Sequence, residues 1–135
     1  MRGIADTGFL VAFANRSDIN HDWAVGIAAR VTEPLLTCEA VLAEAAFRLQ
    51  NAGIVLAMVS EGLVLPAFNC NDHVPQLAAL AKRYADRRPD FADLCLIRMS
   101  ELHPRHGVIT VDVDDFRIYR RNKRETIPLI HPPAR

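Results

Sequence analysis

The stretch that indicates the fold runs from residue 3 to residue 14 and reads GIADTGFLVAFA. It begins with a short apolar run that ends at Asp6, and a helical stretch from Thr7 to Ala14 follows. The same order, a short apolar run and then a longer helical pattern, recurs along the chain. This alternation is typical of an α/β domain with a parallel sheet.

The rest of the chain divides on the same pattern. We expect strands at residues 3–6, 35–37, 63–65, 107–110 and 126–130, and helices at residues 7–14, 22–31, 39–50, 54–61, 72–84 and 90–101. Gly53 is expected just beyond the end of the third helix and Asp72 at the N-cap of the fifth. The predicted fold is a three-layer α/β/α sandwich with a mostly parallel central sheet, in one domain over residues 1–135 with a loose tail at 131–135.

Composition narrows the class of protein. A chain of 135 residues, half of them hydrophobic, can bury the core of one domain without a disulfide or structural zinc. Its formal net charge is zero, so any attraction to a polyanion must come from local charge placement. Cys38, Cys70 and Cys95 form no Cys-x-x-Cys pair, which favours a reducing compartment over a disulfide framework. With no signal peptide and no spanning segment expected, the prediction is a soluble cytoplasmic protein without a membrane partner.

Five acidic residues occupy informative positions. Asp6 ends the first predicted strand, and Asp112 follows the strand at 107–110. Because ligands of a parallel sheet gather at the carboxyl ends of its strands, both carboxylates should face one crevice. Asp90 and Asp93 lie on one face of the first turn of a helix, and Glu44 lies in a helix that is otherwise rich in Ala, Val, Leu and Phe.

Carboxylates that converge in one crevice repel each other unless they are protonated or neutralised by a cation. Mg²⁺ is a hard cation that takes a few carboxylate oxygens and keeps several waters. A metal held in this way suits phosphodiester hydrolysis. Taken singly, each acid also has an ordinary explanation as a strand-end residue, a helix N-cap or an exposed helix residue.

At these residues the sequence resembles the PIN-domain family, and in particular the VapC-type toxins of bacterial toxin–antitoxin pairs. Four acidic motifs carry the resemblance, in order and nearly from end to end: IADTG at residues 4–8, TCEAVLAE at 37–44, DFAD followed by LCL at 90–96, and ITVD at 109–112 with the later Asp115-Phe116. Two features depart from the family pattern. Leu94 stands where the family usually has a small residue, and Asp112, Asp114 and Asp115 crowd together at the last motif.

The resemblance implies a Mg²⁺-dependent endoribonuclease, with Mn²⁺ able to substitute, that is silenced by a cognate antitoxin protein. It implies catalytic roles for Asp6, Glu44, Asp93 and Asp112, of which Asp6, Asp93 and Asp112 would be the metal ligands. Glu44 would orient or deprotonate a water. Thr7, Asp90 and Asp115 are accessory candidates.

Two segments of the sequence each have two possible interpretations. Arg117, Arg120, Arg121, Lys123 and Arg124 would either contact the RNA backbone or form a solvated helix face. The apolar stretch at residues 54–68 is either core or part of a homodimer or antitoxin surface.

Two other functions also remain open at this stage. One is a PIN nuclease of RNA processing or DNA repair that has no antitoxin. The other is a non-catalytic PIN-like module that only binds RNA or protein.

Overall fold

The computed structural model describes residues 1–134 and contains a parallel sheet with helices on both faces. The strands are β1 (Gly3–Ala5), β2 (Leu35–Thr37), β3 (Val64–Pro66), β4 (Gly107–Ile109), β5 (Arg120–Arg121), β6 (Glu125–Thr126) and β7 (Leu129–Ile130). The helices are α1 (Thr7–Ala14), α2 (His21–Ala29), α3 (Glu39–Leu49), α4 (Ala52–Ser60), α5 (Val74–Arg83), α6 (Phe91–Leu102) and α7 (Val113–Ile118), with the short 3₁₀ helices η1 (Cys70–His73) and η2 (Ala85–Arg87).

The main sheet has the strand order β3-β2-β1-β4-β7, and every neighbouring pair is parallel. Ile4 of β1 is in register with Leu36 of β2 on one side and with Val108 of β4 on the other. The carboxyl ends of all five strands therefore lie along one edge. Because β1 and β4 are neighbours, the residues that follow them meet there, and the Asp6 amide donates to the Ile109 carbonyl at 3.0 Å.

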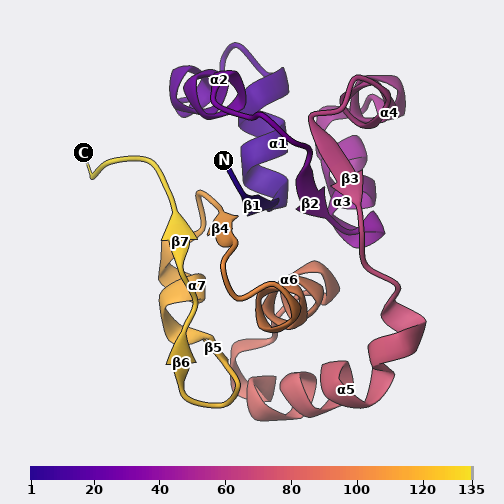
Figure 1. Cartoon of the computed structure of the whole chain (residues 1–135), viewed down its shortest axis with the longest axis vertical. Coiled ribbons are helices and arrows are strands. Elements are labelled where there is room, and N and C mark those ends of the chain that lie inside the picture. Colours follow the sequence, from indigo (N-terminus) through magenta and orange to yellow (C-terminus); the bar gives the residue numbers. More distant parts are fainter. Residues whose placement is uncertain (135) are drawn as a thin grey trace.

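Helices cover both faces of this sheet, which confirms the predicted α/β/α layers. Figure 1 shows α1 and α2 on one side of the row of strands and α5 and α6 on the other. Eight of the twelve residues of α6 are buried, because this helix packs under β1 and β4 and against α3 and α5. Within residues 1–134 we find no helix with the length and apolar character needed to cross a membrane.

Several local expectations at helix ends are wrong. Gln50, with a left-handed φ of 52°, ends α3, whereas Gly53 lies inside α4. The N-cap of α5 is His73 and not Asp72.

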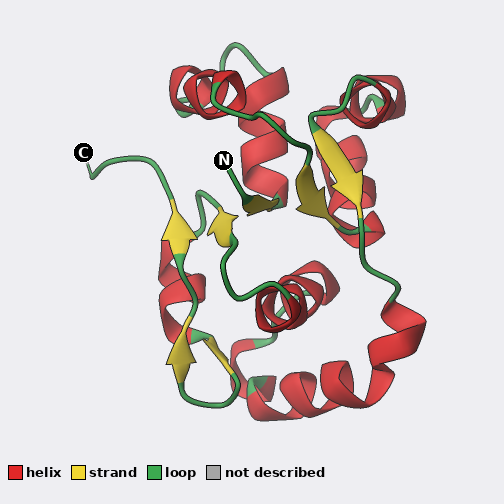
Figure 2. Ribbon diagram, in the orientation of Figure 1, coloured by secondary structure: helices red, strands yellow, loops and turns green. Residues whose placement is uncertain are grey.

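The segment after Asp112 differs most from the expectation. Residues 113–118 form a helix, and the predicted strand at 126–130 is divided in two. Its first part pairs with β5 in a separate hairpin, and its second part joins the main sheet as β7 (Figure 2). Pro128, which has no amide hydrogen, lies at the break. Residues 131–134 of the predicted tail contain no helix or strand, and Arg135 lies outside the described residues.

Gly8 lies where α1 approaches the chain after β4. A Cβ atom on Gly8 would collide with Cγ2 of Val111, a stiff β-branched side chain. We therefore expect Gly8→Ala to lower the free energy of unfolding by about 1–3 kcal/mol, measured by urea denaturation. Gly26→Ala in α2 is the control, because its Cβ would meet nothing within 4 Å and should be neutral or stabilising. Equal stability of Gly8→Ala and the wild type would contradict this close approach.

Candidate metal centre

Asp6 lies directly after β1 at the N-cap of α1, and the residue is only 6% exposed. One oxygen accepts a hydrogen bond from the Thr7 amide at 2.7 Å, and the other accepts from the Thr110 hydroxyl at 2.6 Å. Burial raises the pKa of Asp6 to about 6 even though these hydrogen bonds lower it, and the nearby charges of Asp112 and Asp90 raise it further. Asp6 is therefore held in one orientation in a setting that disfavours its charge.

Asp93 lies in the first turn of α6, and its backbone amide donates to the Asp90 carboxylate at 2.8 Å. This bond makes Asp90 the N-cap of the helix. Asp93 is 7% exposed, and its carboxylate accepts a hydrogen bond from the Tyr119 hydroxyl at 3.0 Å. Burial is the first cause that raises the pKa of Asp93 to about 8, followed by the charges of Asp90 and Asp6.

The third and fourth carboxylates come from the chain after β4. Asp112 precedes α7, and its amide donates to the Thr110 hydroxyl at 2.9 Å. Asp115 lies in the first turn of α7 and forms an ion pair with Arg87 at 2.9 Å. Burial, and then the charge of Asp115, raise the pKa of Asp112.

These residues converge on one place. One carboxylate oxygen each from Asp93, Asp112 and Asp115 can be chosen so that all three lie within 4.8 Å of one another. We call this group the carboxylate cluster. Two of its members are metal ligands expected from the sequence, and the third, Asp115, was expected only as an accessory. Asp6 is not part of the carboxylate cluster by this distance criterion. Its negative charge is nevertheless one of the causes that raise the pKa of Asp93.

Glu44 lies apart from the carboxylate cluster. It is half-buried on α3, and among residues 1–134 it belongs to no group of metal-ligating atoms of this kind. Burial and then the charge of Asp90 raise its pKa, so Glu44 faces the same acidic region from its margin. Its role in orienting or deprotonating a water stays a prediction.

Thr7 contributes a hydroxyl that is buried and has no hydrogen-bond partner. Only one other buried side-chain polar atom in the described part of the chain shares this condition. A buried hydroxyl without a partner is costly, so a polar ligand beside Thr7 would satisfy it. This fits the predicted accessory role of Thr7.

Two residues of the site were not identified from the sequence. Thr110 bridges the first and last acidic motifs, because its hydroxyl donates to Asp6 and accepts from the Asp112 amide. Tyr119 holds Asp93 from the far end of α7. Thr110 lies inside the ITVD motif and could have been noted there, but nothing in the sequence near Tyr119 links it to Asp93, which lies 26 residues away.

The five basic residues after the last motif are not equivalent. Arg117, Lys123 and Arg124 are exposed. The Arg120 side chain instead donates to backbone carbonyls, including that of Tyr119 at 3.1 Å. Arg121 is buried at 8% exposure, where its guanidinium donates to the carbonyls of Ser100 and Pro104 and pairs with Glu125. Arg121 therefore fastens the β5–β6 hairpin to the end of α6, and it is neither on a solvated helix face nor free to contact RNA.

Together, the parallel sheet and its helical layers define a PIN-like α/β fold, as the sequence predicted. A solved structure with this fold is the crystal structure of VapC20 from Mycobacterium tuberculosis, whose description is a Sarcin-Ricin loop cleaving toxin. It is similar to this chain with a TM-score of 0.68 and 19% sequence identity, over 84% of this chain and 92% of that chain. At this identity the likeness establishes the shared fold. No family model matches the chain, and no curated protein sequence does so either.

Proposed function

We propose that this chain is a metal-dependent endoribonuclease that acts as the toxin of a toxin–antitoxin pair. The observation that carries the proposal is the carboxylate cluster of Asp93, Asp112 and Asp115, with buried Asp6 beside it. These acids come from three distant parts of the sequence and meet at the carboxyl edge of the sheet. The shared fold with an RNA-cleaving toxin supports the same activity.

The residues at this edge fit Mg²⁺ or Mn²⁺. All the donors are carboxylate oxygens, which are the ligands that hard divalent cations prefer. Burial first, and then the charges of neighbouring carboxylates, raise the pKa values of Asp6 and Asp93, and a bound cation would favour the charged forms of both groups. The unpartnered Thr7 hydroxyl offers one more polar contact. When bound, such an ion polarises a phosphate oxygen and makes a coordinated water easier to deprotonate.

The residues of the site would then have separate roles. Asp93 and Asp112 would hold the ion, with Asp115 as a third ligand after it releases Arg87. Asp6, fixed by Thr110, would either bind the ion directly or accept a proton from a water that the ion holds. We assign to Glu44 the orientation of the attacking water from the α3 side.

The direct test is cleavage of total RNA by the pure protein, with mapping of the new ends. We expect discrete cuts with Mg²⁺ or Mn²⁺ and none after chelation of the metal. Asp112→Asn should abolish the cuts, whereas Asp114→Asn should retain them, because Asp114 is exposed and outside the carboxylate cluster. Cleavage that survives both chelation and Asp112→Asn would contradict the proposal. Metal binding without any cleavage would favour the non-catalytic alternative.

Exposed cations near α7 are the proposed contacts for the RNA backbone. We expect simultaneous replacement of Arg117, Lys123 and Arg124 by Gln to weaken RNA binding and to flatten its dependence on salt. The slope of log K against log[salt] should fall by about 0.7 for each lost phosphate contact, measured by fluorescence anisotropy. Three exposed cations elsewhere, Arg16, Arg30 and Lys82, provide a control of equal charge. Equal slopes for the two triple variants would show that Arg117, Lys123 and Arg124 do not contact RNA and belong to an ordinary solvated surface.

The proposed protein partners are a cognate antitoxin and a second copy of the chain. Phe47 of α3 is 81% exposed, and Leu56 of α4 and Leu65 of β3 are 64% and 49% exposed. These side chains come from neighbouring elements, since α3 contacts α4 and α4 contacts β3, and a contiguous apolar patch is typical of interaction surfaces. A monomer by analytical ultracentrifugation would contradict the homodimer. Failure of any small protein encoded beside this chain to bind it and suppress cleavage would contradict the antitoxin pairing.

A further inference from the structure

Arg87 brings a positive charge into direct contact with the carboxylate cluster. Its guanidinium donates from Nη2 to Oδ1 of Asp115 at 2.9 Å, although the two residues are 28 positions apart in the sequence. Among the ion pairs within residues 1–134, only this one includes a member of the carboxylate cluster. Arg87 is therefore the cation that the fold places at the proposed metal centre.

The backbone of Arg87 is fixed to the residues that hold Asp93. Arg87 ends η2, and its amide donates to the Tyr84 carbonyl at 2.9 Å. The Tyr84 ring packs edge-on against that of Tyr119, with ring centroids 5.0 Å apart, and the Tyr119 hydroxyl donates to Asp93. Both tyrosines are buried. The position of Arg87 is therefore set by the site, and its long side chain is the part that can move.

The Arg87 guanidinium still has donors available for a ligand. The side chains of Arg87 and Asp115 are 33% and 40% exposed. Within the described residues, the Arg87 side chain makes no hydrogen bond other than the one to Asp115. A guanidinium carries several N–H donors in one plane, an arrangement that matches two oxygens of a phosphate. Because exposed ion pairs contribute little to stability, the contact with Asp115 can open readily.

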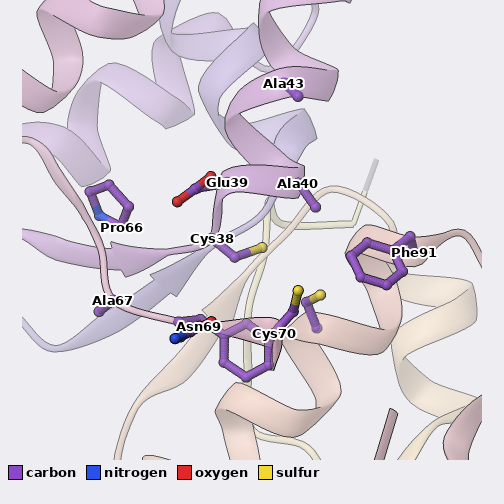
Figure 3. Close-up of a pocket in the computed structure, with 11 residues that line it drawn as sticks. Cys38, Glu39, Ala40, Ala43, Pro66, Ala67, Asn69, Cys70 and Phe91 are labelled. Carbon is purple, nitrogen blue, oxygen red and sulfur yellow. The ribbon is translucent and has the colours of Figure 1, made fainter. Parts of the chain in front are cut away.

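The large pocket at the same edge of the sheet offers no such cation. It has a volume of about 880 Å³ and lies at the carboxyl ends of β2 and β3. Glu39, Asn69 and Phe91 are among the residues that line it, and within the described part of the chain its lining includes no lysine or arginine (Figure 3). A phosphate at this edge would therefore be neutralised from the Arg87 side and not from the pocket.

We propose that Arg87 binds a phosphate of the RNA substrate, and that Asp115 holds the guanidinium beside the metal centre before the substrate binds. Asp115 is the shared partner, because it both accepts from Arg87 and belongs to the carboxylate cluster. A divalent ion and a guanidinium that share one carboxylate weaken each other's contact with it. With Asp115 engaged as a metal ligand, Arg87 can donate to a phosphate oxygen. The phosphate contact rests on the proposed function, whereas the competition for Asp115 needs metal binding only.

The first test measures the Mn²⁺ affinity of the full chain by calorimetry, without RNA. Arg87→Gln should bind Mn²⁺ about two- to fivefold more tightly than the wild type, because Asp115 then has no competing partner. Arg88→Gln is the matched control, since it makes the same change at the next residue, which is exposed and forms no ion pair within residues 1–134. Its affinity should stay close to that of the wild type. No gain in Arg87→Gln, or an equal gain in both variants, would overturn the competition.

The second test measures binding of a short single-stranded RNA by fluorescence anisotropy at several salt concentrations, with Ca²⁺ as the divalent ion. Arg87→Gln should weaken binding and reduce the slope of log K against log[salt] by about 0.7, which corresponds to one lost phosphate contact. Arg87→Lys, which keeps the charge, should restore the slope, and Arg88→Gln should retain it.

The two tests separate this inference from the proposed function. Equal slopes for the wild type and Arg87→Gln would overturn the phosphate contact, even if the protein cleaves RNA. Conversely, a protein that shows the gain in Mn²⁺ affinity and the change in slope, but cuts no RNA, would contradict the proposed function alone.

Discussion

Asp93→Asn is expected to abolish metal-dependent RNA cleavage and, at the same time, to stabilise the metal-free protein. Asp93 is the buried member of the carboxylate cluster, so its replacement removes a charged ligand that water cannot replace. Loss of several kcal/mol of metal-assisted stabilisation corresponds to a rate reduction of at least about 10³-fold. The measurement is the initial rate of cleavage at saturating Mg²⁺.

The gain in stability follows from the same burial. The raised pKa of Asp93 means that its charged form is disfavoured in the folded protein. Asn keeps the size of the side chain and an oxygen that can accept from the Tyr119 hydroxyl, but it removes the charge. Replacing a strained functional residue in this way typically stabilises a protein by about 0.5–2 kcal/mol. We expect that gain at pH 8 without metal, measured by urea denaturation.

Asp114→Asn is the matched control for both effects. It makes the same chemical change on α7, close in sequence to the carboxylate cluster, at an exposed residue. Its cleavage rate and stability should stay close to those of the wild type. A variant at Asp93 that cleaves RNA normally would exclude this carboxylate from the site, and one that is markedly less stable would show that its charge is compensated within the fold.

The sequence predicted most of the fold because its strands and helices carry strong local patterns. The strand at residues 35–37 and the helix at residues 7–14 have the expected bounds. The segment after Asp112 was misjudged because its order depends on contacts distant in sequence. Arg121 shows the reason: its partners, Ser100 and Pro104, lie 21 and 17 residues away. Local pattern gives no indication that a charged residue in a basic run will be buried.

Part of the arrangement of the candidate site could also be predicted from the sequence. The rule that parallel strands end at one edge was enough to bring Asp6 and Asp112 together, since β1 and β4 are neighbours. It could not choose between Asp112 and Asp115, because that choice depends on the turn of α7, and in the structure both reach Asp93. Glu44 was grouped with the others through the resemblance of residues 37–44 to an acidic motif, whereas α3 leaves this residue at the margin. The roles of these residues in metal binding and catalysis stay predictions.

The second large effect concerns pH. Between pH 6 and pH 8 we expect the affinity for Mn²⁺ to rise by about 100-fold, because binding must displace the proton that Asp93 holds up to a pKa of about 8. The proton of Asp6, with a pKa of about 6, adds to this dependence at the acidic end. The measurement is calorimetric titration with Mn²⁺ at several pH values.

The stability of the metal-free protein should change in the opposite direction. The ordinary pKa of Asp is 3.8, whereas the folded values for Asp6 and Asp93 are about 6 and about 8. Over this window the folded state binds more protons than the unfolded state, so the free energy of unfolding falls as pH rises. The contribution of these two groups is fully present below pH 3.8 and is lost as pH passes through about 8.

A divalent cation should reverse that loss, because it binds the ionised carboxylates of the folded state. We therefore expect Mn²⁺ to raise the unfolding midpoint more at pH 8 than at pH 6. Asp93→Asn should flatten both pH dependences, because it removes the group that titrates near pH 8. If the Mn²⁺ affinity stayed level over this range, Asp93 would already be ionised at pH 6. The raised pKa of Asp93, which supports a metal at this edge of the sheet, would then be absent.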